Sequence, residues 1–370
     1  LVFFATILFH INMPSPEFTL FPYVFYLVML NVPTLLFWVG ISFFMVHVVR
    51  IPFLALFILL GYLLLNTFIL SNVAYGSIDV WSTDVPNVFS SLTGHVGPGL
   101  YLLQRFSFVV LAGGMFFGSV IFQKRLTDRE RCFRKLLGVA IGAVVLGGML
   151  GYGYYSHYEE MNQKRKDYLV QYEKNKPERN IEIKSQDIVF KQEGDQIMVV
   201  DDLILENSCS RKIEKIGLFL NPGLQVEQIK TEDRVIDFVR EKQVLVLKEC
   251  FLPHEVKCIR ISYIGEIDES ICYLDLGDKI HTNPLDNQAI MSHGRHAAFV
   301  SDRFTWLTPE CLWYPVRIPP VDPLLPNQSE RDFTSFRLSV ICDTTLTVIS
   351  QGVRIRNKDT VCFTNMQALS

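Results

Sequence analysis

The sequence predicts a multi-domain protein in which an α-helical transmembrane bundle is followed by a soluble all-β domain, built as a sandwich or a saddle-like sheet. Long apolar runs fill the first part, where Arg50 and Arg105 are the only basic residues before Lys124. Charges are frequent after Lys124, although the 370-residue chain has only 20% charged residues and a net charge of −3. This asymmetry indicates lipid around the first part and water around the second. The predicted boundaries are 1–155 for the membrane helices, 156–180 for a charged stalk and 181–370 for the β-rich domain.

Five apolar segments form the predicted membrane bundle. A helix needs roughly 20 apolar residues to cross the hydrocarbon core, and four segments reach that length. The first looks like the end of a truncated helix, and because the chain begins with Leu inside an apolar run we expect a longer parent protein. Pro33 is expected to kink the second segment. The predicted helices cover residues 1–11, 21–47, 51–70, 100–122 and 136–155.

Glycines four residues apart characterise the last two predicted helices. The pairs are Gly114 and Gly118, Gly138 and Gly142, and Gly147 and Gly151. Small residues at this spacing let helix backbones approach closely within a membrane. They predict tight packing in the bundle without identifying a dimer.

The loops predict the orientation of the bundle. Basic residues crowd the connection between the last two predicted helices: Lys124, Arg125, Arg129, Arg131, Arg134 and Lys135. Short basic loops stay in the cytoplasm, so the chain after His157 should be extracytoplasmic. Three basic residues at 164–166 oppose this placement but are fewer. We therefore expect a multi-pass protein of the inner (plasma) membrane with a periplasmic β-domain. The lipid bilayer is its expected partner, and the absence of a basic surplus excludes nucleic acid.

The second half alternates apolar and other residues with a period of two. Such alternation predicts half-buried strands, here around residues 216–220, 259–263 and 336–340. Turn signals separate the strands at Glu193-Gly194-Asp195, Asn221-Pro222-Gly223 and Gln351-Gly352. The charged segment from Glu159 to Arg179 is expected to be a helical stalk.

Seven of the eight cysteines lie in this half, and none has the C-x-x-C spacing of a zinc or redox site. The odd number argues against a fully bridged secreted domain. Buried free thiols are therefore the favoured interpretation, although an extracytoplasmic compartment would be oxidising.

Motifs of enzyme chemistry are missing from the sequence. It contains no H-E-x-x-H, no phosphate-binding G-x-x-x-x-G-K-[ST] and no G-x-S-x-G. His293 and His296 are the nearest approach to a metal pair, but Gly294 favours a solvated loop over a metal site. Arg105 lies within two turns of a helix end, so we expect a structural anchor whose side chain reaches the membrane interface rather than a substrate ligand.

Two groups of segments resemble known families. The stretch Trp81-Ser82-Thr83-Asp84-Val85-Pro86, then Ser91 to His95, then Tyr101 to Arg105 resembles the last outer loop of ABC-2-type export permeases. More particularly, it resembles bacterial permeases fused to an M1-family aminopeptidase domain. The later segments are similar to the N-terminal β-domain of that peptidase family: Leu218 to Leu224, Ile261 to Gly265, Trp313-Tyr314-Pro315, Phe333 to Val340 and Ile349 to Gly352.

The resemblance implies a saddle-like β-domain that packs against a zinc-bearing catalytic domain. That catalytic domain is absent here, so zinc is expected only outside this chain and no cofactor within it. A Gln or Glu of the family's β-domain helps to hold the amino terminus of the substrate, and Glu310 is the nearest candidate. An exposed loop carboxylate without that role is the alternative. No catalytic and no metal-binding residue is predicted in the chain itself.

Two functions follow as hypotheses. In the first, the chain is the central section of an ABC-2-type permease carrying an M1 aminopeptidase-like β-domain, with a separate ABC ATPase and a peptide substrate as partners. It would be catalytically silent by itself, whereas the full-length protein would be a zinc metallo-aminopeptidase. In the second, the helices only anchor a non-catalytic β-domain that binds a partner protein or peptide.

Overall fold

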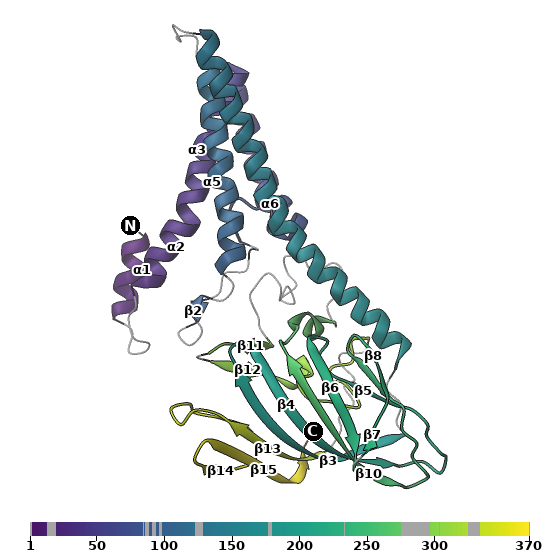
Figure 1. Ribbon diagram of the computed structural model, residues 1–370. Helices are drawn as coiled ribbons and strands as arrows, with labels where there is room; N and C mark the ends of the chain where they lie inside the picture. Colours follow the sequence, from purple (N-terminus) through teal and green to yellow (C-terminus); the bar gives the residue numbers. More distant parts are fainter. Residues whose placement is uncertain are drawn as a thin grey trace. The chain divides into compact units, whose positions relative to one another are not determined.

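The computed structural model describes most of the chain in two compact units. The described residues are 2–12, 20–83, 85, 89–90, 94–95, 98–122, 129–176, 180–232, 234–274, 297–302, 304–324 and 334–369. Among them, the first unit extends to Glu160 and the second begins at Met161. The predicted order, helices followed by a large β-rich part, is confirmed (Figure 1). We call the two parts the helical unit and the β-domain.

The helical unit contains apolar helices of very different lengths. Three segments are long and apolar enough to cross a membrane by length and composition: Tyr23–Val49, Pro98–Ile121 and Phe133–Lys174. The predicted segment 51–70 forms a shorter helix of 17 residues. The helices are α1 (Val2–Ile11), α2 (Phe21–Tyr26), α3 (Val32–Val49), α4 (Pro52–Phe68), α5 (Pro98–Ile121) and α6 (Arg129–Lys174), with a π-helical turn η1 (Leu27–Asn31) and a 3-10 segment η2 (Leu70–Gly76).

Two boundaries differ from the sequence prediction. Helix α6 begins at Arg129, so the basic connection is shorter than expected, and it continues without a break into the predicted stalk. No proline lies in the part of the stalk that α6 includes, since the first one, Pro177, follows the end of α6 at Lys174, and Glu160 lies four residues before Lys164, a spacing that stabilises a helix. At Pro33 the disturbance takes the form of the π-helical turn that precedes α3. Proline lacks the N–H of a regular helical turn, which explains an irregular turn at this point.

Glycine packing occurs at some of the predicted positions. A Cβ on Gly147 would come within 2.6 Å of Leu111, and one on Gly114 within 3.1 Å of Val144, so α5 and α6 are in close contact there. Gly138 and Gly142 have nothing within 4 Å of a Cβ. A Cβ on Gly118 would come within 3.1 Å of Phe44 of α3, so the prediction of close packing is confirmed for Gly114, Gly118 and Gly147 and wrong for Gly138 and Gly142.

A mixed eight-stranded sheet dominates the β-domain. Its strand order is β14-β15-β13-β3-β4-β10-β6-β7, and β13 pairs with β3 in parallel while the other neighbours are antiparallel. The strands are β3 (Ile181–Glu193), β4 (Gln196–Asn207), β6 (Leu224–Thr231), β7 (Arg234–Val235), β10 (Val256–Gly265), β13 (Thr334–Ile341), β14 (Val353–Asn357) and β15 (Thr360–Leu369). The sheet is a single large one with additions rather than two equal layers.

Smaller elements complete the fold. A three-stranded sheet contains β5 (Ile216–Phe219), β9 (Val244–Leu247) and β8 (Phe238–Glu241) in that order. The two-stranded pairs are β1 (Phe89–Ser90) with β2 (Gly94–His95) and β11 (Ala298–Val300) with β12 (Thr305–Leu307), and two 3-10 turns are η3 (Glu269–Tyr273) and η4 (Pro309–Cys311).

Alternation of side chains builds the core of the β-domain. In β4 the buried residues Ile197, Val199, Leu203 and Leu205 alternate with more exposed ones, which is the predicted period of two. The β3–β4 hairpin turns at Gly194 with φ +63°, a conformation that glycine adopts without strain. The turn prediction there is confirmed.

The cysteines are only partly as expected. All seven cysteines of the β-domain are free thiols, but only Cys311 is fully buried, and Cys258 is exposed. The prediction of seven buried thiols is therefore wrong. Cys258 lies on the solvent side of β10, where alternation turns every second side chain outward.

Candidate functional site

Asn221 joins three separate segments of the β-domain. Its Nδ2 donates hydrogen bonds to the carbonyl oxygens of Asp268 (3.1 Å) and Cys311 (2.6 Å). Its Oδ1 accepts from the backbone N–H of Gly223 (2.9 Å) and of Asp268 (2.9 Å). The buried amide thus links the loop after β5 to η3 and η4, and we call this group the Asn221 junction.

The local sequence explains why Asn221 adopts this role. The bond from Gly223 N to Asn221 Oδ1 closes the turn that the Asn-Pro-Gly sequence favours. A Cβ on Gly223 would lie 2.1 Å from the carbonyl oxygen of Glu266, so only glycine fits. The turn therefore approaches the neighbouring backbone at a distance that a side chain would prevent.

Backbone hydrogen bonds hold the Trp313 segment beside β5. Phe219 N donates to Val316 O (2.7 Å), Val316 N to Phe219 O (2.9 Å), and Asn221 N to Leu312 O (2.8 Å). Leu312 has φ +54°, which turns the chain at the end of η4. The motifs at 218–224 and 313–315, nearly a hundred residues apart in sequence, form one structure.

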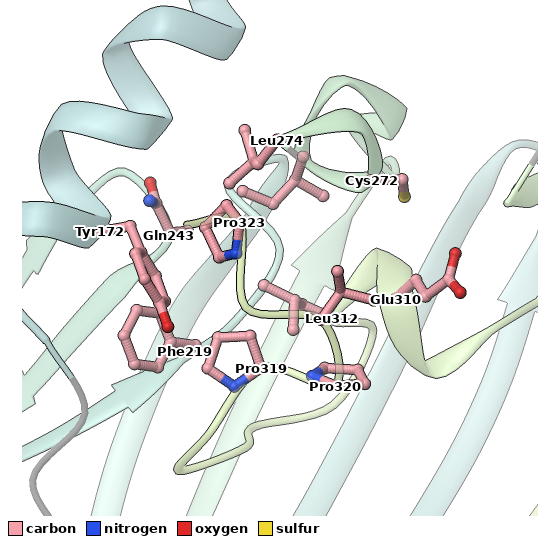
Figure 2. Close-up of a pocket in the computed structure, with 12 residues that line it drawn as sticks. Tyr172, Phe219, Gln243, Cys272, Leu274, Glu310, Leu312, Pro319, Pro320 and Pro323 are labelled. Atoms are coloured by element: carbon pink, nitrogen blue, oxygen red, sulfur yellow. The ribbon is translucent and has the colours of Figure 1, made fainter. Parts of the chain in front are cut away.

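A small cavity lies next to the junction (Figure 2). Its volume is about 30 Å³, room for a water molecule or an ammonium group but not for an amino-acid side chain. Aromatic, proline and leucine side chains form most of its wall, and the polar lining side chains are Gln243, Glu310, Cys272 and the hydroxyl of Tyr172.

Glu310 is half-buried in η4 and lines the cavity. In Figure 2 its carboxylate points away from Tyr172 and Phe219 on the other side of the cavity. The carboxylate thus lies toward the rim, so an amine that it binds would lie outside the cavity.

Gln243 and Arg240 contribute polar atoms that sequence reasoning missed. Gln243 is 1% exposed, its Nε2 donates to Tyr168 O (2.6 Å), and its Oε1 has no hydrogen-bond partner among the described residues. Arg240 Nη2 donates to the carbonyl oxygens of Leu220 (3.0 Å) and Asn221 (2.7 Å), and burial lowers the pKa of Arg240 to about 10. Both residues stabilise the junction from the three-stranded sheet.

The thiols at the junction are not reactive nucleophiles. Burial raises the pKa of Cys311 to about 12, and burial together with nearby Cys311 raises the pKa of Cys272 well above its usual value. Thiols in this state bind metals poorly. No group of three His, Cys, Asp or Glu residues in the described part could hold a metal ion. The described residues therefore do not fit the zinc ion of a peptidase, and His293 and His296 lie outside them.

A second buried polar group lies beneath the Trp313 segment. Gln186 Nε2 donates to Asp201 Oδ2 (3.2 Å) and to Pro315 O (2.8 Å), and the Tyr263 hydroxyl donates to Trp313 O (3.2 Å). Asp201 is 0% exposed, and burial raises its pKa well above the usual value, which favours the neutral form of the carboxyl group. This cluster attaches the Trp313 segment to β3, β4 and β10.

In the helical unit, the prediction that the Arg105 side chain reaches the membrane interface is wrong. It is 1% exposed, and its guanidinium donates to the carbonyl oxygens of Asp79 (2.8 Å) and Val80 (3.0 Å). It also donates to Gln104 Oε1 (2.6 Å) and Thr34 Oγ1 (3.3 Å). The loop carbonyls offer nearer partners than bulk water, so Arg105 anchors the loop from inside the protein.

Gln104 and Asp79 complete this network. Gln104 Nε2 donates to the carbonyl oxygens of Gly76 (3.0 Å) and Asp79 (2.9 Å), and the Asp79 carboxylate accepts from Trp81 N (2.9 Å) and Thr83 N (2.6 Å). The segments around Trp81 and Arg105 are therefore joined by hydrogen bonds, while Asp84, Pro86 and Ser91 to Thr93 lie outside the described residues. We call this group the Arg105 network.

Some of these roles have a weak signal in the sequence. The Asn-Pro-Gly triplet was interpreted as a turn only, although a buried Asn side chain can bond four groups. In Asp201-Asp202, a period of two requires one carboxylate to face the core, which was overlooked. Gln243 and Arg240 have no local signal, because their partners lie on other elements.

Comparisons with known proteins identify similar solved structures for part of the chain. The M1 zinc metallopeptidase from Deinococcus radiodurans is similar at 14% identity with a TM-score of 0.37, covering 51% of this chain and 39% of that one. Legionella pneumophila aminopeptidase A in complex with aspartic acid is similar at 9% identity with a TM-score of 0.37, covering 52% of this chain and 20% of that one. The chain thus spans well under half the length of these enzymes. No family model and no curated protein matches it.

Proposed function

We propose that this chain is the membrane section and N-terminal β-domain of an ABC-2-type export permease joined to an M1 aminopeptidase-like domain. The helices form part of an export channel driven by a separate ATPase. The β-domain binds peptides for a zinc-bearing catalytic domain that this chain does not contain. The observation that carries the proposal is that the permease-like and peptidase-like segments each converge in space.

The Arg105 network supports the permease part. The segments around Trp81 and Arg105 carry the resemblance separately in the sequence, and Arg105 and Gln104 join them through main-chain carbonyl groups. A charged residue inside a membrane bundle is costly, so such a residue marks a functional or structural centre. Here the cost is offset by hydrogen bonds to the outer loop, which fixes the loop over the helix ends.

The Asn221 junction supports the peptidase part. It brings the Leu218 to Leu224 segment against the Trp313 segment, and Tyr263 in the third motif binds Trp313 O. A fixed platform of this kind can hold Glu310 at the rim where a peptide amino terminus would arrive. A carboxylate and an ammonium group would form a charge-assisted hydrogen bond there.

A matched pair of variants tests the role of Glu310 in the complete protein. Glu310→Gln keeps the size of the side chain and removes its charge, and we expect about tenfold weaker binding of peptides with a free amino terminus. Peptides with an acetylated amino terminus should bind both proteins equally. Equal affinity of the two proteins for free-amine peptides would remove Glu310 from the proposal. Stoichiometric zinc in the purified 370-residue chain would contradict a catalytically silent chain.

We propose that the β-domain is extracytoplasmic, in the periplasm. The six basic residues between Lys124 and Lys135, just before α6 and in its first turns, support this side. Cys258 is exposed and offers a probe: a membrane-impermeant maleimide should label it in intact spheroplasts. Labelling only after lysis would place the β-domain in the cytoplasm.

A binding module tethered to the membrane is the second candidate, and the free edge of the large sheet favours it. Every residue of β14 is exposed, and Val353 and Ile355 are more than half exposed. An exposed apolar edge strand is a template for another strand. Deleting upstream helices distinguishes the two functions, because export would be lost while partner binding would persist.

A further inference from the structure

An apolar groove lies between α3, α5 and α6 of the helical unit. Its volume is about 970 Å³, which is in the upper range of ligand pockets. Its walls include Phe44 of α3, Phe122 after α5 and Ile141 of α6. Among the described residues that line it, Arg50 is the only one with a charge.

Close packing of α5 on α6 borders the groove. Gly147 of α6 packs on Leu111, and Gly114 of α5 packs on Val144, with hypothetical Cβ contacts of 2.6 Å and 3.1 Å. Gly118 of α5 faces Phe44 of α3 instead. The lining continues to Ile121 at the end of α5 and Phe133 near the start of α6.

A positive charge lies at one end of the groove. Arg50 lines it and is exposed at the C-terminal end of α3, where its own backbone is left-handed with φ 59°. An apolar groove with a basic end is complementary to a molecule with an apolar chain and an anionic head.

We propose that this groove is a binding site for an anionic phospholipid of the bilayer. Its phosphate would bind Arg50, and an acyl chain would lie along Ile141 and Val145 of α6. The inference rests on the proposed membrane insertion of the helices. A lipid suits the groove because its lining is apolar except for Arg50, which an anionic head group would pair with.

Two variants of the full chain test the site after removal of bound lipid. Native mass spectrometry measures the binding of phosphatidylglycerol and of phosphatidylcholine to the detergent-solubilised protein. Arg50→Gln should weaken phosphatidylglycerol binding about fivefold and leave phosphatidylcholine unchanged. Ile141→Trp should fill the groove and weaken the binding of both lipids.

Each variant has a matched control. Lys135→Gln removes a positive charge from an exposed residue near the same end that does not line the groove, and Val139→Trp adds the same bulk at an exposed residue of α6 outside it. Both controls should bind the two lipids as the unmodified chain does. Equal affinity of the unmodified chain for the two lipids would overturn the inference, and so would unchanged binding in Arg50→Gln or Ile141→Trp.

The membrane premise has a separate test. Extraction of membranes with alkaline carbonate should leave the chain in the membrane pellet. Release into the supernatant would contradict the proposed function itself. Retention in the pellet without a preference for phosphatidylglycerol would contradict the lipid site alone.

Discussion

The helical unit and the β-domain both bury an ionisable side chain, but they stabilise it in opposite ways. Arg105 is 1% exposed and donates to four different oxygen acceptors. Asp201 is 0% exposed, and its Oδ1 has no hydrogen-bond partner in the described part of the chain. A guanidinium keeps its proton, so it must be surrounded by acceptors, whereas a carboxyl group can avoid a buried charge by holding a proton. The helical unit therefore depends on hydrogen-bond geometry, and the β-domain on protonation.

Replacing Arg105 should produce the largest effect. Arg105→Leu keeps an apolar side chain of moderate size but leaves the carbonyl groups of Asp79 and Val80 without these donors. We expect a loss of about 3–5 kcal/mol, as for one partner removed from a buried charged group. The measurement is thermal unfolding of the detergent-solubilised chain, with exposed Arg134→Leu as the control. A similar midpoint for both variants would mean that the outer loop does not need Arg105.

Replacing Asn221, the centre of the Asn221 junction, should have the next largest effect. Asn221→Ala deletes four buried hydrogen bonds and leaves their backbone partners unsatisfied. We expect destabilisation of about 3 kcal/mol in urea unfolding, read from the β-sheet signal in circular dichroism. Asn357→Ala on the exposed edge strand β14 is the control and should change little. A small effect of Asn221→Ala would show that water replaces the amide.

These two residues also illustrate how far sequence reasoning extends. Periodicity predicted helices in the first part and the strands around 216–220, 259–263 and 336–340, which are β5, β10 and β13, because repetition along the chain is a local property. The same reasoning placed Arg105 at an interface, since its distance from the helix end was visible but the carbonyl groups of the loop at 79–80 were not. The predicted stalk merged with α6 up to Lys174 because its sequence has no proline or glycine before Pro177 that would end a helix.

The candidate site was less accessible to sequence reasoning. Glu310 was selected by resemblance, and no pattern revealed that its carboxylate would point away from the cavity. Asn221, Gln243 and Asp201 act through partners on distant segments, and such contacts depend on the order of strands in the sheet. One sequence does not specify that order, since the parallel pairing of β13 with β3 has no local signal.

The protonated state of Asp201 predicts a pH dependence that the Arg105 network should lack. Burial raises the folded-state pKa of Asp201, with Asp202 and Asp187 adding negative charge nearby and Gln186 acting in the opposite direction. The folded state thus holds a proton that the unfolded state releases above its pKa of about 3.9. The stability is fully present below that pH and falls as the pH rises toward the folded-state pKa, by up to about 1.4 kcal/mol per pH unit.

Urea unfolding between pH 4 and pH 8 measures how the stability of the β-domain changes with pH. Asp201→Asn mimics the neutral acid and should remove most of the loss of stability with rising pH. Asp202→Asn, on the exposed face of the same strand, should keep that loss. Parallel pH profiles for the unmodified chain and Asp201→Asn would mean that the buried carboxyl group is ionised in the folded state.

The smallest expected effect is a difference in thiol reactivity, without a change in stability. It tests whether other buried acids of the β-domain also keep their protons. Because burial raises the pKa of Cys311 to about 12, its thiolate fraction at pH 8 is about one in ten thousand. Cys258 is exposed, and although partial burial also raises its pKa, reagent can reach it. Iodoacetamide should therefore modify Cys258 well before Cys311 in the folded chain, as followed by peptide mass spectrometry. In urea the two cysteines should react at similar rates, because unfolding gives both thiols the same solvent. Equal modification rates of Cys258 and Cys311 in the folded chain would mean that the Asn221 junction opens to solvent. The β-domain would then differ from the Arg105 network in rigidity rather than in the protonation of its buried groups.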